Sequence, residues 1–159
     1  MKNLFAAALF VFLPVAAMAD TQLERLENVA EQMSEAMFGA MVRMVEKEGG
    51  DPAPLLEAVP DSDWDADYRE AGSCLLEKYV EASSTSAVDK MLDEMEAFIP
   101  KMAGIDLESL EADQDFLPEG VSEEYSMQVN SDCGMNELMM DRMENSGFMA
   151  AVMQAMAGQ

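Results

Sequence analysis

Apolar residues alternate at spacings of three and four along the first part of the chain, and charged residues occupy the positions between them. This pattern is typical of an amphipathic helix with one buried stripe. Gly49 and Gly50 are expected to end this helix. We therefore expect a long first helix whose buried stripe consists of Leu23, Leu26, Ala30, Met33, Met37, Ala40 and Met44.

Two further helices are predicted in the middle of the chain. The segment 49–62 is rich in proline and glycine, so we expect a connecting loop there. A second helix should begin near Asp63, because Ser62 or Asp63 can accept a hydrogen bond from the first-turn amides. A third should follow the serine-rich segment 83–86 and end at Pro100, since proline disrupts a helix interior.

The C-terminal part is expected to contain a short helix at 106–112, one helix within 120–145, and a final helix from Phe148 to Ala157. Gly147 is the predicted stop between the last two. No alternating run of β-branched residues indicates a sheet. The sequence therefore predicts an all-α fold, a small helical bundle of about four to five helices.

The first nineteen residues have the features of a secretory signal peptide. Lys2 precedes an apolar run, and small residues at Ala17 and Ala19 mark a cleavage site. The run is shorter than the ~20 residues of a membrane-spanning helix. We expect a signal peptide at 1–19, a single α-helical domain at 20–159, a periplasmic or secreted location, and no membrane attachment after cleavage.

The chain has two cysteines, Cys74 and Cys133. In an oxidising compartment, two solitary and widely separated cysteines most often pair. A redox or copper-binding thiol pair is the alternative, but there is no C-x-x-C spacing and no histidine to support it. We therefore predict one disulfide, Cys74–Cys133.

Acidic residues outnumber basic ones by thirty-two to nine, which gives a net charge of −23. Such a surface repels phosphate backbones and anionic headgroups, so nucleic acid and membrane surfaces are excluded as partners. The string DSDWDAD has aspartates at alternate positions, as calcium loops do. However, Ala66 and Gly72 stand where the EF-hand pattern, counted from Asp61, requires glycine and glutamate. We predict no metal site and no cofactor.

Catalysis is disfavoured because the chain has no histidine and no setting that would activate a serine or a thiol. A carboxylate-based hydrolase is a weaker alternative, because acidic residues are abundant. The sequence selects no pair among them and offers no aromatic platform for a sugar. We therefore expect a protein that is not an enzyme.

Methionine is the most conspicuous feature of the C-terminal part. Met139 and Met143, like Met149 and Met153, lie one helical turn apart, and thioethers are suitable ligands for Cu(I). A periplasmic Cu(I)-binding protein is therefore one alternative. Methionine also takes the place of leucine at Met33, Met37, Met41 and Met44 of the first helix, where its flexible side chain suits a core or a contact surface. A core or partner-contact role explains the spacing without any metal.

The final predicted helix is apolar on nearly every side, with Gln154 as its strongly polar residue. Either it closes the core against the first helix or it contacts an unknown protein partner or a second copy of the chain. We predict an exported, acidic, non-catalytic binding module. Its partner-binding residues are expected to be Phe148, Met149, Val152, Met153 and Met156.

Overall fold

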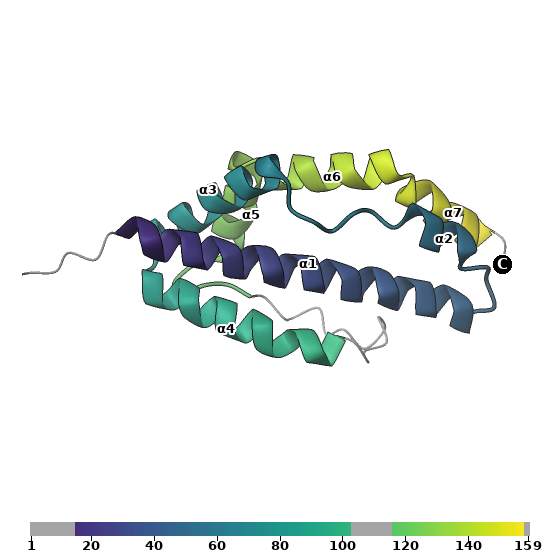
Figure 1. Ribbon diagram of the computed structural model, residues 1–159, viewed down its shortest axis with the longest axis horizontal. Helices are drawn as coiled ribbons and strands as arrows, with labels where there is room; N and C mark the ends of the chain where they lie inside the picture. Colours follow the sequence, from purple (N-terminus) through teal and green to yellow (C-terminus); the bar gives the residue numbers. More distant parts are fainter. Residues whose placement is uncertain (1–14, 103–115, 158–159) are drawn as a thin grey trace, which may run out of the picture.

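The computed structural model describes residues 15–102 and 116–157, with side chains for 20–102 and 116–155. The all-α class is confirmed, but the described residues form seven helices, more than the four to five predicted. They are α1 (Val15–Lys47), α2 (Ala53–Ala58), α3 (Ala66–Ala82), α4 (Thr85–Met102), α5 (Glu123–Asp132), α6 (Met135–Ser146) and α7 (Phe148–Ala157) (Figure 1).

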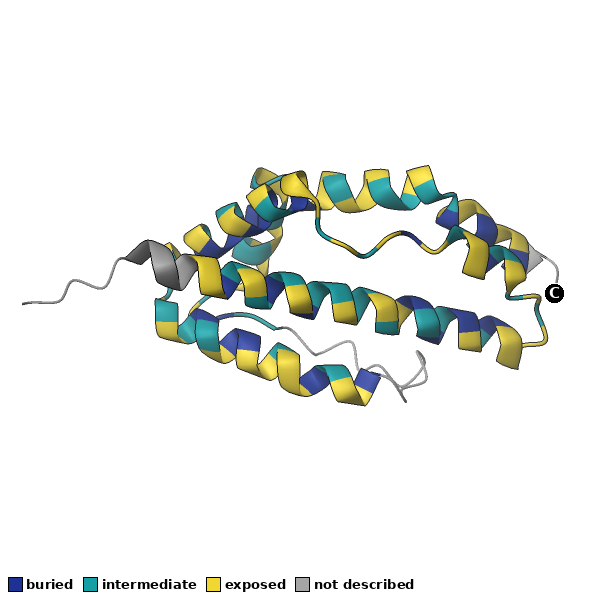
Figure 2. Ribbon diagram, in the orientation of Figure 1, coloured by how far each residue is buried: buried dark blue, intermediate teal, exposed yellow. Residues whose placement is uncertain are grey.

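The long helix α1 is the axis of the molecule. The helices α3, α4 and α5 lie around its N-terminal half, whereas α2 and α7 lie at its C-terminal end (Figure 1). The helix α6 runs between these two groups. Figure 2 shows buried residues along the inner faces of the helices. They form two main clusters and a small third one, which consists of Tyr68, Ala71 and Met135.

The core is divided in the same way. The first cluster joins α1, α3, α4 and α5 through residues that include Leu26, Leu75, Leu92 and Val129. The second cluster joins α1, α2 and α7 and consists of Phe38, Val42, Val45, Leu55, Phe148, Ala151 and Ala155.

This division explains why the predicted stripe of α1 is only partly correct in its second half, where Ala40 is buried as predicted. Met37 is exposed, while Phe38, Val42 and Val45 are buried. The first half of α1 packs on α3 and α4, and the second half packs on α2 and α7. One continuous stripe cannot serve neighbours that approach from different sides.

The additional helices arise where proline and glycine misled the sequence interpretation. The predicted loop contains α2. Pro52 is the N-cap residue of this helix, and Pro54 lies in its first turn, where proline is tolerated. Leu55, which is 1% exposed, fixes this turn in the second cluster. The helix predicted within 120–145 is two helices, because Gly134 adopts a left-handed conformation (φ 77°) between α5 and α6.

The end of α4 also differs from the prediction. Pro100 lies inside the last turn rather than limiting the helix. Phe98 and Met102, four residues apart, are both buried, so packing supports the continuation of the helix beyond Pro100 to Met102. The stop at Gly147 is as predicted: its φ is 76°, and its amide donates to the carbonyl of Glu144.

The predicted disulfide is confirmed. Cys74 of α3 is bonded to Cys133, which caps the C-terminal end of α5, with an S–S distance of 2.00 Å and a Cα–Cα distance of 5.7 Å. The bond ties the two helices together beside the first core cluster.

Parts of the predicted organisation lie outside the described residues. These are the helix at 106–112 and positions 1–14 of the signal peptide. Because α1 begins at Val15, the predicted cleavage position after Ala19 falls in its first turns, and cleavage stays a prediction. None of the helices in 15–102 and 116–157 combines the length and the hydrophobicity that crossing a bilayer requires.

Candidate binding site

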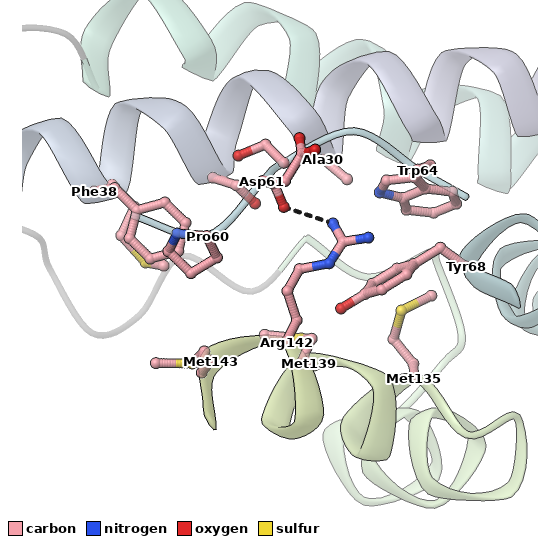
Figure 3. Close-up of a pocket in the computed structure, with 13 residues that line it drawn as sticks. Ala30, Phe38, Pro60, Asp61, Trp64, Tyr68, Met135, Met139, Arg142 and Met143 are labelled. Carbon is pink, nitrogen blue, oxygen red and sulfur yellow. Dashed lines mark hydrogen bonds between the residues drawn. The ribbon is translucent and has the colours of Figure 1, made fainter. Parts of the chain in front are cut away.

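A cavity of about 120 Å³ opens between α1, α3, α6 and the segment 59–65. Figure 3 shows it with its lining side chains. We call it the methionine cavity, because α1 contributes Met37 and α6 contributes Met135, Met139 and Met143. The aromatic rings in its lining are those of Phe38, Trp64 and Tyr68.

Helix periodicity places the methionines. Met135, Met139 and Met143 are spaced by four residues, so they lie along one face of α6. That helix begins directly after the left-handed turn at Gly134. Met135 is buried against Tyr68, whereas 48% of Met139 is exposed at the edge of the cavity.

The aromatic wall is positioned by caps and by close packing. The carboxylate of Asp65 accepts hydrogen bonds from the amides of Asp67 and Tyr68, which fixes Tyr68 in the first turn of α3. The amide of Trp64 donates to Glu31 Oε1 of α1 at 2.9 Å. A Cβ at Gly72 would lie 2.4 Å from the Trp64 ring, so glycine at this position makes room for the indole.

Arg142 connects α6 to the segment 59–65 across the cavity. Its guanidinium donates to the carbonyl oxygens of Asp61 (2.8 Å) and Asp63 (3.0 Å), the first of which is dashed in Figure 3. It also lies 3.9 Å from the centre of the Tyr68 ring and 3.7 Å from the Asp65 carboxylate. A cation over an aromatic face is attracted by the ring quadrupole.

The surroundings of Tyr68 also act on its hydroxyl. Burial raises the pKa of Tyr68 above its ordinary value. The cation of Arg142 opposes this rise, while Asp65 and Asp141 add to it. The ring is therefore neutral at physiological pH and serves as an apolar wall with a cation on its face.

Replacing Arg142 by glutamine is expected to lower the free energy of unfolding by about 1–3 kcal/mol, because two charge-assisted hydrogen bonds and the contact with Tyr68 are lost. Chemical denaturation measures this change. Arg142→Lys keeps the cation but not the forked geometry, so it should recover only part of the loss. Unchanged stability in Arg142→Gln would show that Arg142 does not hold the segment 59–65.

The predicted site on the final helix is divided by the structure. Phe148 is 0% exposed, and Val152 packs against the same second cluster. Met149 and Met153 are exposed, the latter by 70%. The side chain of Met156 lies outside the described residues. The helix α7 therefore closes the core on one side and presents two methionines on the other.

A second hollow, of about 420 Å³, lies beside the disulfide on another side of α6. We call it the acidic hollow, because its lining contains the exposed carboxylates of Asp67, Glu70, Asp132, Glu137 and Asp141. Across 15–102 and 116–157, no group of three or more histidine, cysteine, aspartate or glutamate side chains is arranged to hold a metal ion.

The site is interpreted from its geometry. Comparisons with protein-family models, with curated proteins and with solved structures gave no match. The sequence interpretation placed the site on α7 and missed the contribution of Trp64, Tyr68 and Arg142. The spacing of Met135, Met139 and Met143 was the signal that pointed to one face of α6, but the partner elements of that face are distant in sequence.

Proposed function

We propose that the protein is an exported, non-catalytic binding module that receives an apolar group of a protein partner in the methionine cavity. The observation that carries this proposal is a concave, aromatic-walled cavity with exposed methionines at its edge, Met37 and Met139. Binding sites are typically concave and mostly apolar with a few fixed polar groups. Methionine side chains adapt to the shape of what they contact.

The residues at the cavity support binding rather than catalysis. Among the described residues that line the cavity, Asp61 is the only acidic one. Its carboxylate accepts a hydrogen bond from the amide of Asp63. Ser34 and Ser62 also line the cavity. The chain has no histidine to serve as their base. The disulfide supports the exported location, because such bonds persist in oxidising compartments.

A neutral apolar dye tests the proposal. Trp64 is the only tryptophan of the chain and lines the cavity, so it can transfer energy to bound N-phenyl-1-naphthylamine, whose phenyl ring is small enough to enter while the naphthyl group lies at the opening. We expect saturable transfer in residues 20–159. Met37→Gln together with Met139→Gln should weaken binding about tenfold, which corresponds to about 1.4 kcal/mol.

The matched control replaces Met127 and Met153 by glutamine. Both are more exposed than Met139, at 60% and 70%, and neither lines the cavity. This variant should bind the dye as the parent does. Absence of saturable binding, or equal weakening in both double variants, would contradict the proposal.

Cu(I) binding is a second candidate function, because four thioethers line one cavity, those of Met37, Met135, Met139 and Met143. Leucine replacement separates the two candidates, since leucine keeps the apolar volume but cannot bind copper. In anaerobic titrations against a competing chelator, we expect no tight uptake of Cu(I). Stoichiometric uptake that is lost in Met37→Leu/Met139→Leu/Met143→Leu, with dye binding retained, would favour the copper function.

A further inference from the structure

We propose that the occupant of the methionine cavity is a cationic amphipathic helix of a partner protein. One apolar side chain of that helix enters the cavity, and its basic side chains lie over the surrounding carboxylates. This inference rests on the proposed function and specifies the chemistry of the partner.

The size of the cavity limits what can enter. An apolar protein cavity of about 150 Å³ holds one benzene molecule. The methionine cavity, at about 120 Å³, therefore admits one side chain of the size of leucine. In helix recognition of this kind, a partner helix lays its apolar face on a hydrophobic surface. One side chain of that face would enter the cavity, and its neighbours would contact the exposed methionines Met37 and Met139.

The two hollows are arranged around α6. Met135 and Met139 line the methionine cavity, whereas Glu137 and Asp141 line the acidic hollow. Residues two apart project from opposite sides of a helix, so the apolar and acidic sites lie on opposite flanks of α6, about 10 Å apart. Met140, which is 54% exposed, adds apolar surface on the same helix. Lysine and arginine side chains that border the apolar face of a bound helix are long enough to reach carboxylates on the flank of α6.

The negative charge of the surface around the cavity favours a positively charged partner. Among the described residues that line the acidic hollow, none is basic. Asp61 and Asp63 add exposed carboxylates next to the methionine cavity, and Arg142, the basic residue of that cavity, is already engaged by their carbonyl oxygens. A surface of this kind attracts basic segments and speeds their association.

The same charge disfavours other occupants. Two copies of a chain with net charge −23 repel each other, and an anionic lipid surface is repelled as well. A flexible methionine surface also tolerates variation in the apolar residues of its partner. The combination points to a basic helix rather than to a second copy or a membrane.

Three synthetic peptides of about eighteen residues test the inference with residues 20–159. The first is a lysine and leucine sequence with one apolar helical face. The second has glutamate in place of lysine, and the third has the lysine and leucine residues in an order that leaves no apolar face. Binding is followed by the fluorescence of Trp64. We expect the first peptide to bind at least tenfold more tightly than the others, and its affinity to fall as salt is added.

Two variants locate the contacts. Met37→Gln/Met139→Gln should lower the affinity for the first peptide about tenfold. Glu137→Gln/Asp141→Asn should also lower this affinity when it is measured at low salt. The matched charge control is Glu77→Gln/Glu81→Gln, an exposed pair with the same spacing on α3 outside both hollows. The control variant should bind the first peptide as the parent does.

The outcomes distinguish this inference from the proposed function. If the second or the third peptide binds as tightly as the first, the inference of a cationic amphipathic helix is wrong, while dye binding still supports the methionine cavity as a binding site. If light scattering shows a dimer that Met37→Gln/Met139→Gln dissociates, a second copy is the occupant and the inference is wrong. If neither the dye nor any peptide binds, the proposed function itself fails.

Discussion

Replacing Phe148 by alanine is expected to lower the free energy of unfolding by about 3–5 kcal/mol, the usual range for removing a fully buried aromatic ring. Phe148 is 0% exposed, and its ring meets that of Phe38 edge to face at a centroid distance of 4.9 Å. It lies in the second core cluster with Val45 and Leu55. Its removal leaves a cavity between α1, α2 and α7.

Chemical denaturation monitored by circular dichroism gives the change in stability, and limited proteolysis of α7 reports its release. The matched control is Met153→Ala on the same helix, which should change stability by less than about 0.5 kcal/mol because Met153 is mostly exposed. Similar stabilities of the two variants would contradict the assignment of Phe148 to the core and return α7 to consideration as a free contact surface.

Removing the disulfide by Cys74→Ala/Cys133→Ala is expected to lower the free energy of unfolding by roughly 4 kcal/mol. The two cysteines are 59 positions apart, so the bond closes a long loop in the unfolded chain and reduces its entropy. Urea denaturation measures the loss. The urea dependence should also become steeper, because an unfolded chain without the crosslink exposes more surface.

Reduction of the parent protein is the control for this prediction, because it breaks the bond without changing either side chain to alanine. It should shift the unfolding midpoint about as far as the double substitution does. Thiol labelling of the denatured, unreduced protein should find no free thiol. Labelling of both cysteines, or a midpoint that does not respond to reduction, would contradict the bridge.

Local patterns in the sequence were sufficient for the fold class and the disulfide. The three-four spacing after Leu23 and the left-handed glycine at 147 report on the helix that contains them or adjoins them, so both are readable without tertiary information. The cysteine pairing needed only the number of cysteines and the expected compartment.

Features that depend on contacts between distant helices were not readable. The buried face of α1 changes at Phe38 because α2 and α7 pack there. No local sequence pattern predicts that these two helices contact α1. Pro52 and Pro54 suggested a loop, although Pro52 as the N-cap and Pro54 in the first turn are both compatible with α2, and the burial of Leu55 favours a helix there.

The candidate site shows the same limit. The spacing of Met135, Met139 and Met143 predicts a shared helix face, but it does not show that Trp64 and Tyr68 complete the cavity. Arg142 joins α6 to the segment 59–65 through backbone carbonyl oxygens, about eighty positions away in the chain. Backbone acceptors carry no sequence signature, so this contact required the structure.

The most direct test of the methionine cavity is a methyl NMR titration of residues 20–159 labelled with ¹³C at the methionine methyl groups. The lysine and leucine amphipathic peptide is added to saturation. We expect the largest changes in chemical shift for the methyl resonances of Met37, Met135, Met139 and Met143, while the resonances of Met127 and Met153 do not move. Shifts confined to Met149 and Met153, or no shifts at all, would contradict binding in the cavity.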